Sequence, residues 1–136
     1  MPASRSAFTL LEMIVVLAIA AMAIGLGAGG VMQWEESTAL RNAARKAEGV
    51  FVQAMTRSVT ATGVQMLELG NLAEGMRFEV RRAGAADYAP AAGQRLFLPP
   101  GGLCEPLSLR WRQKESRITA TPDPLTGVFT QMEEGL

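Results

Sequence analysis

The chain begins with a long apolar run that contains one acidic residue near its start. Between Phe8 and Trp34 the only charged side chain is that of Glu12, and the run is far longer than the usual strand of five or six residues. About 20 apolar residues are needed for an α-helix to cross a bilayer. The pattern therefore predicts a transmembrane half of an N-terminal helix over residues 8–34.

A second pattern follows directly, with no intervening linker. Apolar residues now recur at spacings of three and four, and polar residues such as Arg41, Arg45 and Arg57 fill the other face. The apolar positions are Leu40, Ala43, Ala44, Ala47, Val50, Phe51, Ala54 and Met55. This spacing is typical of an amphipathic helix whose apolar stripe faces a core. We predict an amphipathic half over 35–62 that continues the first helix.

Residues 63–136 alternate with a period of two, which is typical of half-buried strands. Strands are expected at 64–69, 76–81, 95–98, 107–112, 118–121 and 128–132, with a turn at Gly70, a loop over 84–94 and a hairpin around 122–127. We predict an α+β fold in which one long helix packs on a small antiparallel β head. Its core would combine the helix stripe with Phe78, Trp111 and Ile118.

Composition limits the chemistry that the chain can perform. The 136 residues contain no His and a single Cys, Cys104, which excludes Ser-His-Asp and Cys-His nucleophilic sites, His-ligated zinc and thiolate metal clusters. Lys plus Arg and Asp plus Glu number 13 each, so no overall field attracts nucleic acid. We predict a protein that is not an enzyme, with no catalytic, cofactor-binding or metal site. Cys104 is expected to be a buried apolar residue rather than an exposed free thiol.

Glu12 is the leading candidate for a functional residue. An acidic side chain at the centre of a membrane helix costs roughly 2.5 to 3.5 kcal/mol on insertion scales, so such groups usually have a partner or a role.

The residues around it, Ala7-Phe8-Thr9-Leu10-Leu11-Glu12 and the apolar run that follows, resemble the class III signal of type IV pilins and type II secretion pseudopilins. The resemblance implies that a prepilin peptidase removes the leader, residues 1–7, by cutting between Ala7 and Phe8. It also implies N-methylation of the new amine of Phe8 and a role for Glu12 in assembly. The family usually has Gly where this chain has Ala7, a departure that bears on the rate of cutting.

Simple electrostatics agrees with this resemblance. A free α-amino group has a pKa near 8, so the amine of Phe8 would be mostly cationic at neutral pH once exposed. The Glu12 carboxylate could pair with it within one helix, or with the Phe8 amine of a neighbouring subunit. The second arrangement would neutralise a buried carboxylate and fix the axial register of the subunits.

Two other readings of the N-terminus share its topology. One is an ordinary secretory signal with Arg5 as the basic region and cleavage after Ala21-Met22-Ala23, and the other is an anchor that is never cut. Arg5 on the short leader favours a single-pass topology in the inner membrane, with a cytoplasmic N-terminus and a periplasmic head.

The segment with Gly25, Gly27, Gly29 and Gly30 fits the dinucleotide pattern G-x-G-x-x-G through Gly25, Gly27 and Gly30. That pattern has meaning only between a short strand and a helix, and here the preceding run is too long for a strand. We interpret these glycines as positions where a membrane helix can bend and where another helix can approach closely.

The segment Ile118 to Asp123, with Gly127 and a last strand, looks like the final hairpin of H-type minor pseudopilins and FimT-like minor pilins. Major pseudopilins carry an acidic calcium loop near this place, whereas Asp123 stands alone between prolines. The resemblance implies a structural minor subunit of a type II secretion pseudopilus. A minor pilin of a type IV pilus, for adhesion, motility or DNA uptake, is the alternative, as is a membrane-tethered binding module that does not polymerise. The implied partners are other pseudopilin subunits, the prepilin peptidase, an inner-membrane assembly platform and the lipid bilayer.

Arg110, Arg112 and Lys114 share one face of a predicted strand. With Arg117 nearby, they could bind DNA phosphates or dock an acidic partner. We interpret them instead as the solvated face of an edge strand. No aromatic residue is expected on that face to stack a base, which argues further against nucleic acid. Trp111 on the opposite face is expected in the core, and Glu133-Glu134 is expected to be a solvated tail.

Overall fold

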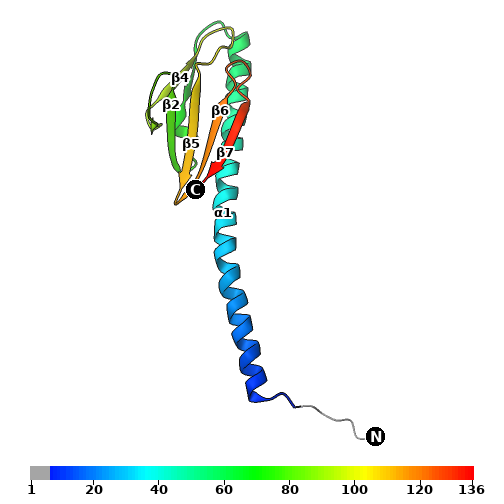
Figure 1. Ribbon diagram of the computed structural model, residues 1–136. Coiled ribbons are helices and arrows are strands. Elements are labelled where there is room, and N and C mark those ends of the chain that lie inside the picture. The colour runs from blue at the N-terminus through cyan, green and yellow to red at the C-terminus, as the bar shows by residue number, and fades with distance from the viewer. Residues whose placement is uncertain (1–6) are drawn as a thin grey trace, which may run out of the picture. The chain divides into compact units, whose positions relative to one another are not determined.

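The computed structural model describes residues 7–136 and contains two compact units, one that ends at Glu35 and one that runs from Glu36 to Leu136. We call the second the globular unit. The elements are α1 (Leu10–Thr60), β1 (Gln65–Glu68), the 3-10 helix η1 (Leu69–Leu72), β2 (Arg77–Arg82), β3 (Ala89–Pro90), β4 (Arg95–Leu98), β5 (Leu107–Gln113), β6 (Ser116–Pro122) and β7 (Phe129–Gly135). The predicted α+β architecture, one long N-terminal helix with antiparallel sheets, is confirmed (Figure 1).

The helix α1 is continuous through the junction between the two predicted halves and ends at Thr60. Its apolar stripe points into the globular unit, where Leu40, Ala43, Ala44, Ala47, Phe51 and Met55 are buried. Val50 was expected in the stripe but is 37% exposed, because it lies at the edge of the buried face.

Two antiparallel sheets lie beside this helix in the globular unit. The larger has the strand order β3-β2-β5-β6-β7, and β1 pairs with β4 in the smaller. The hairpin around 122–127 is confirmed as the connection between β6 and β7. The prediction that Arg110 and Arg112 lie on an edge strand is wrong, because β5 is hydrogen-bonded to β2 on one side and β6 on the other.

Three local features were missed in the sequence. The expected turn at Gly70 is part of η1, and the expected loop over 84–94 contains β3, which pairs with β2. The last strand extends to Gly135, so Glu133-Glu134 is not a tail. Short segments of low strand propensity, such as Ala89–Pro90, become strands only because a neighbouring edge offers them backbone partners.

The core joins the helix stripe to the inner face of the larger sheet. The Trp111 ring is fully buried and stacks on Phe78 with ring centroids 4.7 Å apart, and Ile118 is also buried, so the three predicted core residues are confirmed. The Trp111 Nε1–H donates a hydrogen bond of 2.9 Å to the Leu72 carbonyl oxygen. A buried indole N–H needs such a partner, and η1 supplies it.

The β6–β7 connection approaches α1 closely at Gly127. Its φ is +76°, and a Cβ there would lie 3.0 Å from both Met55 Cγ and the Phe51 carbonyl oxygen. Asp123 Oδ1 accepts hydrogen bonds from the backbone N–H groups of Leu125 (2.8 Å) and Thr126 (3.0 Å), which hold the turn and lower the pKa of the Asp123 carboxyl. The structure therefore gives Asp123 a turn-forming role.

Candidate functional site

Glu12 lies in the first turn of α1, and Thr9 caps that turn. Thr9 Oγ1 accepts a hydrogen bond of 3.2 Å from the backbone N–H of Glu12, and the Thr9 carbonyl oxygen accepts one of 3.2 Å from Met13. Thr9 is thus the N-cap and Glu12 the third helical residue, the sequence spacing of a capping box, of which only the bond to the Thr9 side chain is formed. The positive end of the helix macrodipole favours a carboxylate at this position.

Within residues 7–136, no side chain forms a hydrogen bond or an ion pair with the Glu12 carboxylate. The predicted cleavage point is next to it. Ala7 and Phe8 precede the helix and both are exposed, whereas the rest of the leader, including Arg5, lies outside the described residues. Cleavage between Ala7 and Phe8, and methylation of Phe8, therefore remain predictions from the sequence.

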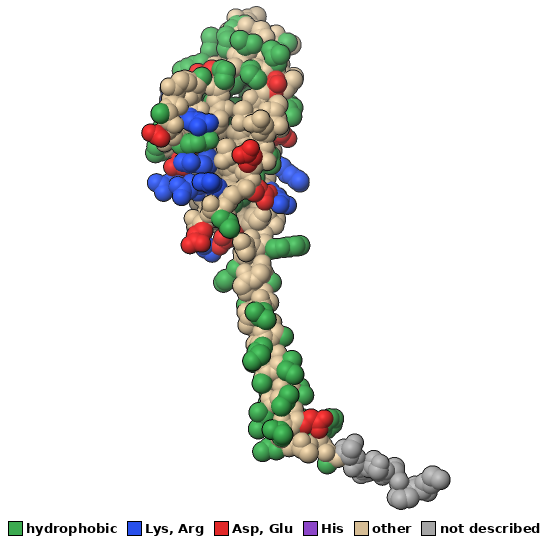
Figure 2. Space-filling model, viewed as in Figure 1, with side chains coloured by type: hydrophobic (Ala, Val, Ile, Leu, Met, Phe, Trp, Pro, Cys, Tyr) green, Lys and Arg blue, Asp and Glu red, His purple; other side chains and the backbone are tan. Residues whose placement is uncertain are grey.

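The part of α1 that belongs to the first unit exposes its apolar side chains on every side. All the large hydrophobic residues from Leu10 to Trp34 are exposed, Trp34 to 81%. Figure 2 shows apolar side chains along this part of the helix. By length and composition, this helix could cross a membrane, and none of its most apolar window is buried. These features fit a membrane anchor of the kind typical of pilins.

The four glycines of the apolar run leave no interruption in α1, which is helical through Gly25, Gly27, Gly29 and Gly30. A Cβ at any of them would meet open space within this chain. The chain itself therefore supplies no steric reason for glycine at these positions. The roles predicted for them, bending and close helix approach, remain predictions.

The basic residues Arg110, Arg112 and Lys114 do not form a single group. Lys114 lies in the turn after β5, and its Nζ is 2.5 Å from Oε1 of Glu36 in α1. Arg110 instead lies on the outer face of the sheet, 2.7 Å from Glu79 Oε2, and its Cζ is 3.9 Å from the centroid of the Tyr88 ring. The expectation that no aromatic residue shares this face is wrong, because the segment before β3 places Tyr88 over it.

Glu79 and Tyr88 are the residues of this face that the sequence analysis missed. Glu79 lies on the face of β2 opposite to Phe78, yet it is only 7% exposed because Arg77 and Arg110 of the same face cover it. The only signal in the sequence was the two-residue spacing of Arg77, Glu79 and Arg81, which places the three side chains on one face of the strand. This spacing does not show which side chains of other strands bury Glu79.

Cys104 is a free cysteine, and its prediction as a buried residue is confirmed, with 2% of its surface exposed. Burial, and secondarily the Glu105 carboxylate, raises the pKa of the thiol to about 11. A thiol in this state is a poor nucleophile at neutral pH.

Comparison with protein families finds a match to the prokaryotic N-terminal methylation motif over residues 2–28. Neither the curated proteins nor the solved structures contain a significant match to this chain. The motif covers the predicted leader, Phe8 and Glu12, together with the glycines up to Gly27. It indicates a type IV pilin-like, pseudopilin-type chain, a class of structural subunits rather than enzymes, which a prepilin peptidase processes and which assemble with other pilin subunits.

Proposed function

We propose that this protein is a structural minor subunit of a type II secretion pseudopilus, held in the inner membrane until its N-terminal helix packs into a periplasmic filament that supports protein export. The observation that carries this proposal is Glu12. Within the described residues its carboxylate has no partner, and it lies in the first turn of α1, whose part up to Trp34 carries no other charge and exposes its large apolar side chains.

The free energy of the charged Glu12 side chain differs between the bilayer and the helix bundle of a filament. Near the edge of a bilayer, a first-turn carboxylate can reach the headgroup region and keep part of its hydration. In a bundle of apolar helices the same carboxylate would be buried, and burying an unpaired charge costs several kcal/mol. The cationic amine of Phe8 from a neighbouring subunit would neutralise it there. We therefore expect Glu12 to favour the assembled state only when that amine has been released by cleavage.

The glycines support packing of this helix against others. Gly25 and Gly29 lie one turn apart on one face of α1, where a Cβ meets nothing in this chain. Small residues at this spacing let two helices approach closely in a membrane or in a filament core. Neighbouring chains would supply the contacts that the isolated chain lacks.

The test replaces Glu12 and follows incorporation into the filament. Glu12→Gln keeps the shape of the side chain without its charge, and we expect filament incorporation to fall at least about tenfold, since loss of a buried charged partner exceeds 1.4 kcal/mol. Glu35→Gln, in the same helix and also exposed, is the matched control and should assemble normally. Normal assembly of Glu12→Gln would refute this role.

Processing is tested separately by mass spectrometry of the mature chain. The proposal expects a chain that begins at methylated Phe8. An intact Met1, or a start at Ile24, would instead indicate the uncut anchor or the ordinary secretory signal.

The resemblance of the last hairpin to H-type and FimT-like subunits is the reason for preferring a minor subunit. A minor pilin of a type IV pilus has the same architecture and is the second candidate. Loss of secretion with normal twitching in a deletion strain would support the pseudopilus, whereas the opposite result would support the pilus.

A further inference from the structure

The outer face of the larger sheet carries arginines directly opposite one another. In the strand register Arg77 on β2 pairs with Arg112 on β5, and Arg112 pairs with Arg117 on β6. Like charges directly opposite on neighbouring strands destabilise a sheet. Within the part of the chain that the structure describes, neither Arg112 nor Arg117 forms an ion pair. A bound anion would relieve this repulsion.

A neighbouring row of the same face holds one arginine in a fixed position. Glu79 pairs with Arg110 across β2 and β5, and the Arg110 Nε and Nη2 atoms lie 2.8 and 2.7 Å from Glu79 Oε2. The Tyr88 ring contacts the Arg110 guanidinium and also lies 5.0 Å from Arg81 Cζ. A guanidinium restrained by a buried carboxylate and a ring loses little further freedom when it binds a ligand.

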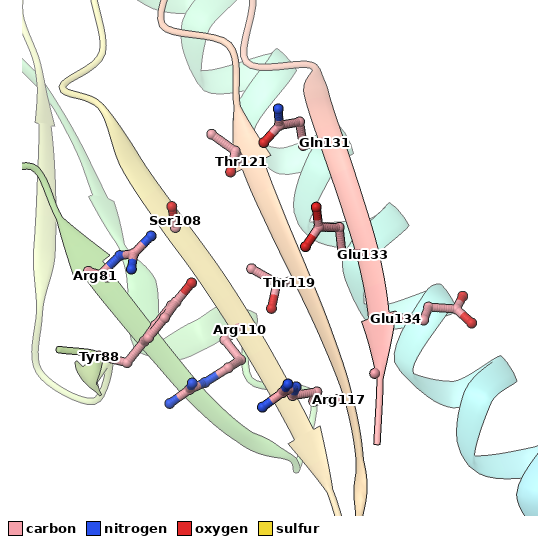
Figure 3. A pocket seen from close by; sticks show the side chains of 11 residues that line it. Arg81, Tyr88, Ser108, Arg110, Arg117, Thr119, Thr121, Gln131, Glu133 and Glu134 are labelled. Carbon is pink, nitrogen blue, oxygen red and sulfur yellow. The ribbon is translucent and has the colours of Figure 1, made fainter. Parts of the chain in front are cut away.

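Of the side chains named so far, Arg81, Tyr88, Arg110 and Arg117 line a hollow of about 340 Å³ over β2, β5, β6 and β7. Figure 3 shows Arg81, Arg110 and Arg117 on this face, with Glu133 on the strand beside them. Hydroxyl and amide groups of Ser108, Thr119, Thr121 and Gln131 complete the lining. Glu134 points away toward α1. The hollow therefore combines cationic donors with neutral and acidic acceptors.

This combination matches a polypeptide better than a nucleic acid. Guanidinium groups bind carboxylates through paired hydrogen bonds, and Gln131 and Glu133 could accept N–H groups from a peptide backbone. A phosphodiester backbone offers no N–H donors that Gln131 and Glu133 could accept. The Tyr88 ring already contacts two guanidinium groups, and the chain as a whole has no net charge to attract a polyanion.

We propose that this surface, the arginine face, formed by Arg77, Arg81, Arg110, Arg112 and Arg117, binds an acidic segment of a partner protein. The partner's Asp or Glu carboxylates lie against the row of Arg77, Arg112 and Arg117. Its backbone N–H groups lie toward Glu133 on β7. This role concerns the globular unit and does not depend on Glu12.

The test uses the full chain in non-ionic detergent and fluorescence anisotropy at low salt. The probes are a fluorescein-labelled peptide of alternating Glu and Ser, the same peptide with Gln in place of Glu, and a labelled oligothymidine of similar length. We expect the acidic peptide to bind and the Gln peptide not to bind. The double variant Arg112→Gln/Arg117→Gln should bind the acidic peptide at least about tenfold more weakly, as expected when charged hydrogen-bond partners are lost.

Three controls keep the result interpretable. Arg45→Gln removes the same charge from an exposed helix position outside the face and should leave binding unchanged. Tyr88→Leu leaves the charge intact but removes the ring contacts, and should weaken binding. Near-ultraviolet circular dichroism of the buried Trp111 reports whether each variant is folded.

Equal binding by the double variant and the wild type would overturn the proposal, as would the absence of acidic-peptide binding. Tighter binding of oligothymidine than of the acidic peptide would assign the face to nucleic acid instead. Glu12→Gln should bind the peptide normally, so failure of the filament role and failure of this proposal can be told apart.

Discussion

Glu134 in the last strand and Arg41 in the helix form a two-point ion pair that joins the two layers of the globular unit. Arg41 Nη2 donates to Glu134 Oε2 at 2.9 Å, Arg41 Nε pairs with Oε1, and Ser37 Oγ lies 3.5 Å from Oε2. These partners lie 93 and 97 residues away from Glu134 along the chain. A segment expected to be a solvated tail is therefore attached to α1.

Removing this pair should lower stability at neutral pH. The hydrogen bond from Arg41 lowers the pKa of the Glu134 carboxyl below its ordinary value of 4.5. Its contribution is therefore present above pH 4.5 and is lost as pH falls through the lowered pKa. We expect Glu134→Gln to lower Tm slightly at pH 7 and low salt, the small effect usual for exposed pairs, and to have a smaller effect at pH 3 and at high salt.

Glu133→Gln is the matched control, because within the described chain Glu133 forms no ion pair. Thermal unfolding monitored by circular dichroism at the two pH values measures both variants. An equal effect of the two variants at pH 7 would contradict the role given to Arg41.

Gly127 should tolerate no side chain. Gly127→Ala places a residue at positive φ, which costs about 1 to 2 kcal/mol, and also presses a Cβ on Phe51 and Met55, which costs about 1 to 3 kcal/mol more. Gly84→Ala is the matched control, because Gly84 has a φ of +83° but open space around its Cβ. Urea unfolding should show Gly127→Ala to be the more destabilised. Equal losses would mean that the approach to α1 is not a tight fit.

Cys104 should resist alkylation in the folded protein. With its pKa raised to about 11, its thiolate fraction at pH 8 is about 100-fold below that of a thiol of pKa 9, and burial slows access further. Iodoacetamide labelling followed by mass spectrometry should be slow in the native state and fast in urea. Because the unfolded thiol ionises first, stability should fall as pH rises above about 9, and Cys104→Ala should remove that fall. Rapid native labelling would contradict this account.

Thr9 should fix where α1 begins. Thr9→Val removes the oxygen that accepts the Glu12 N–H and should cost about 0.5 to 2 kcal/mol of helix stability at that end. In detergent micelles, amide hydrogen exchange at Glu12 should become faster in Thr9→Val and stay near the wild-type rate in Thr9→Ser. Unchanged exchange in Thr9→Val would show that the cap does not protect this turn.

We expect the opposed arginines of the arginine face to lower the stability of the unliganded protein. Arg112→Gln removes repulsion with Arg77 and with Arg117 and should raise the free energy of unfolding by about 0.2 to 1 kcal/mol for each pair. Chemical unfolding without ligand measures this gain. A loss of stability would indicate that Arg112 has a structural role within the sheet.

Local patterns in the sequence were sufficient for the elements whose signals are short in range. The apolar run, the stripe from Leu40 to Met55 and the alternation around Trp111 predicted one continuous helix, the inner faces of the strands and the core. The methylation motif is likewise contiguous, so Phe8 and Glu12 could be named as candidates from neighbouring residues. For the helix and the strands, the physical reason is the fixed period of 3.6 or 2 residues with which side chains return to one face. For the motif, the reason is that all its residues are neighbours in the sequence.

Only the tertiary structure decided which strands are neighbours. The placement of β5 between β2 and β6 sets Arg112 between two other arginines, covers Glu79 and brings Tyr88 to Arg110. The same pairing carries Glu134 to Arg41. Strand order and register arise from contacts between residues far apart in the chain, and periodicity tells which face a side chain is on but not what stands opposite it.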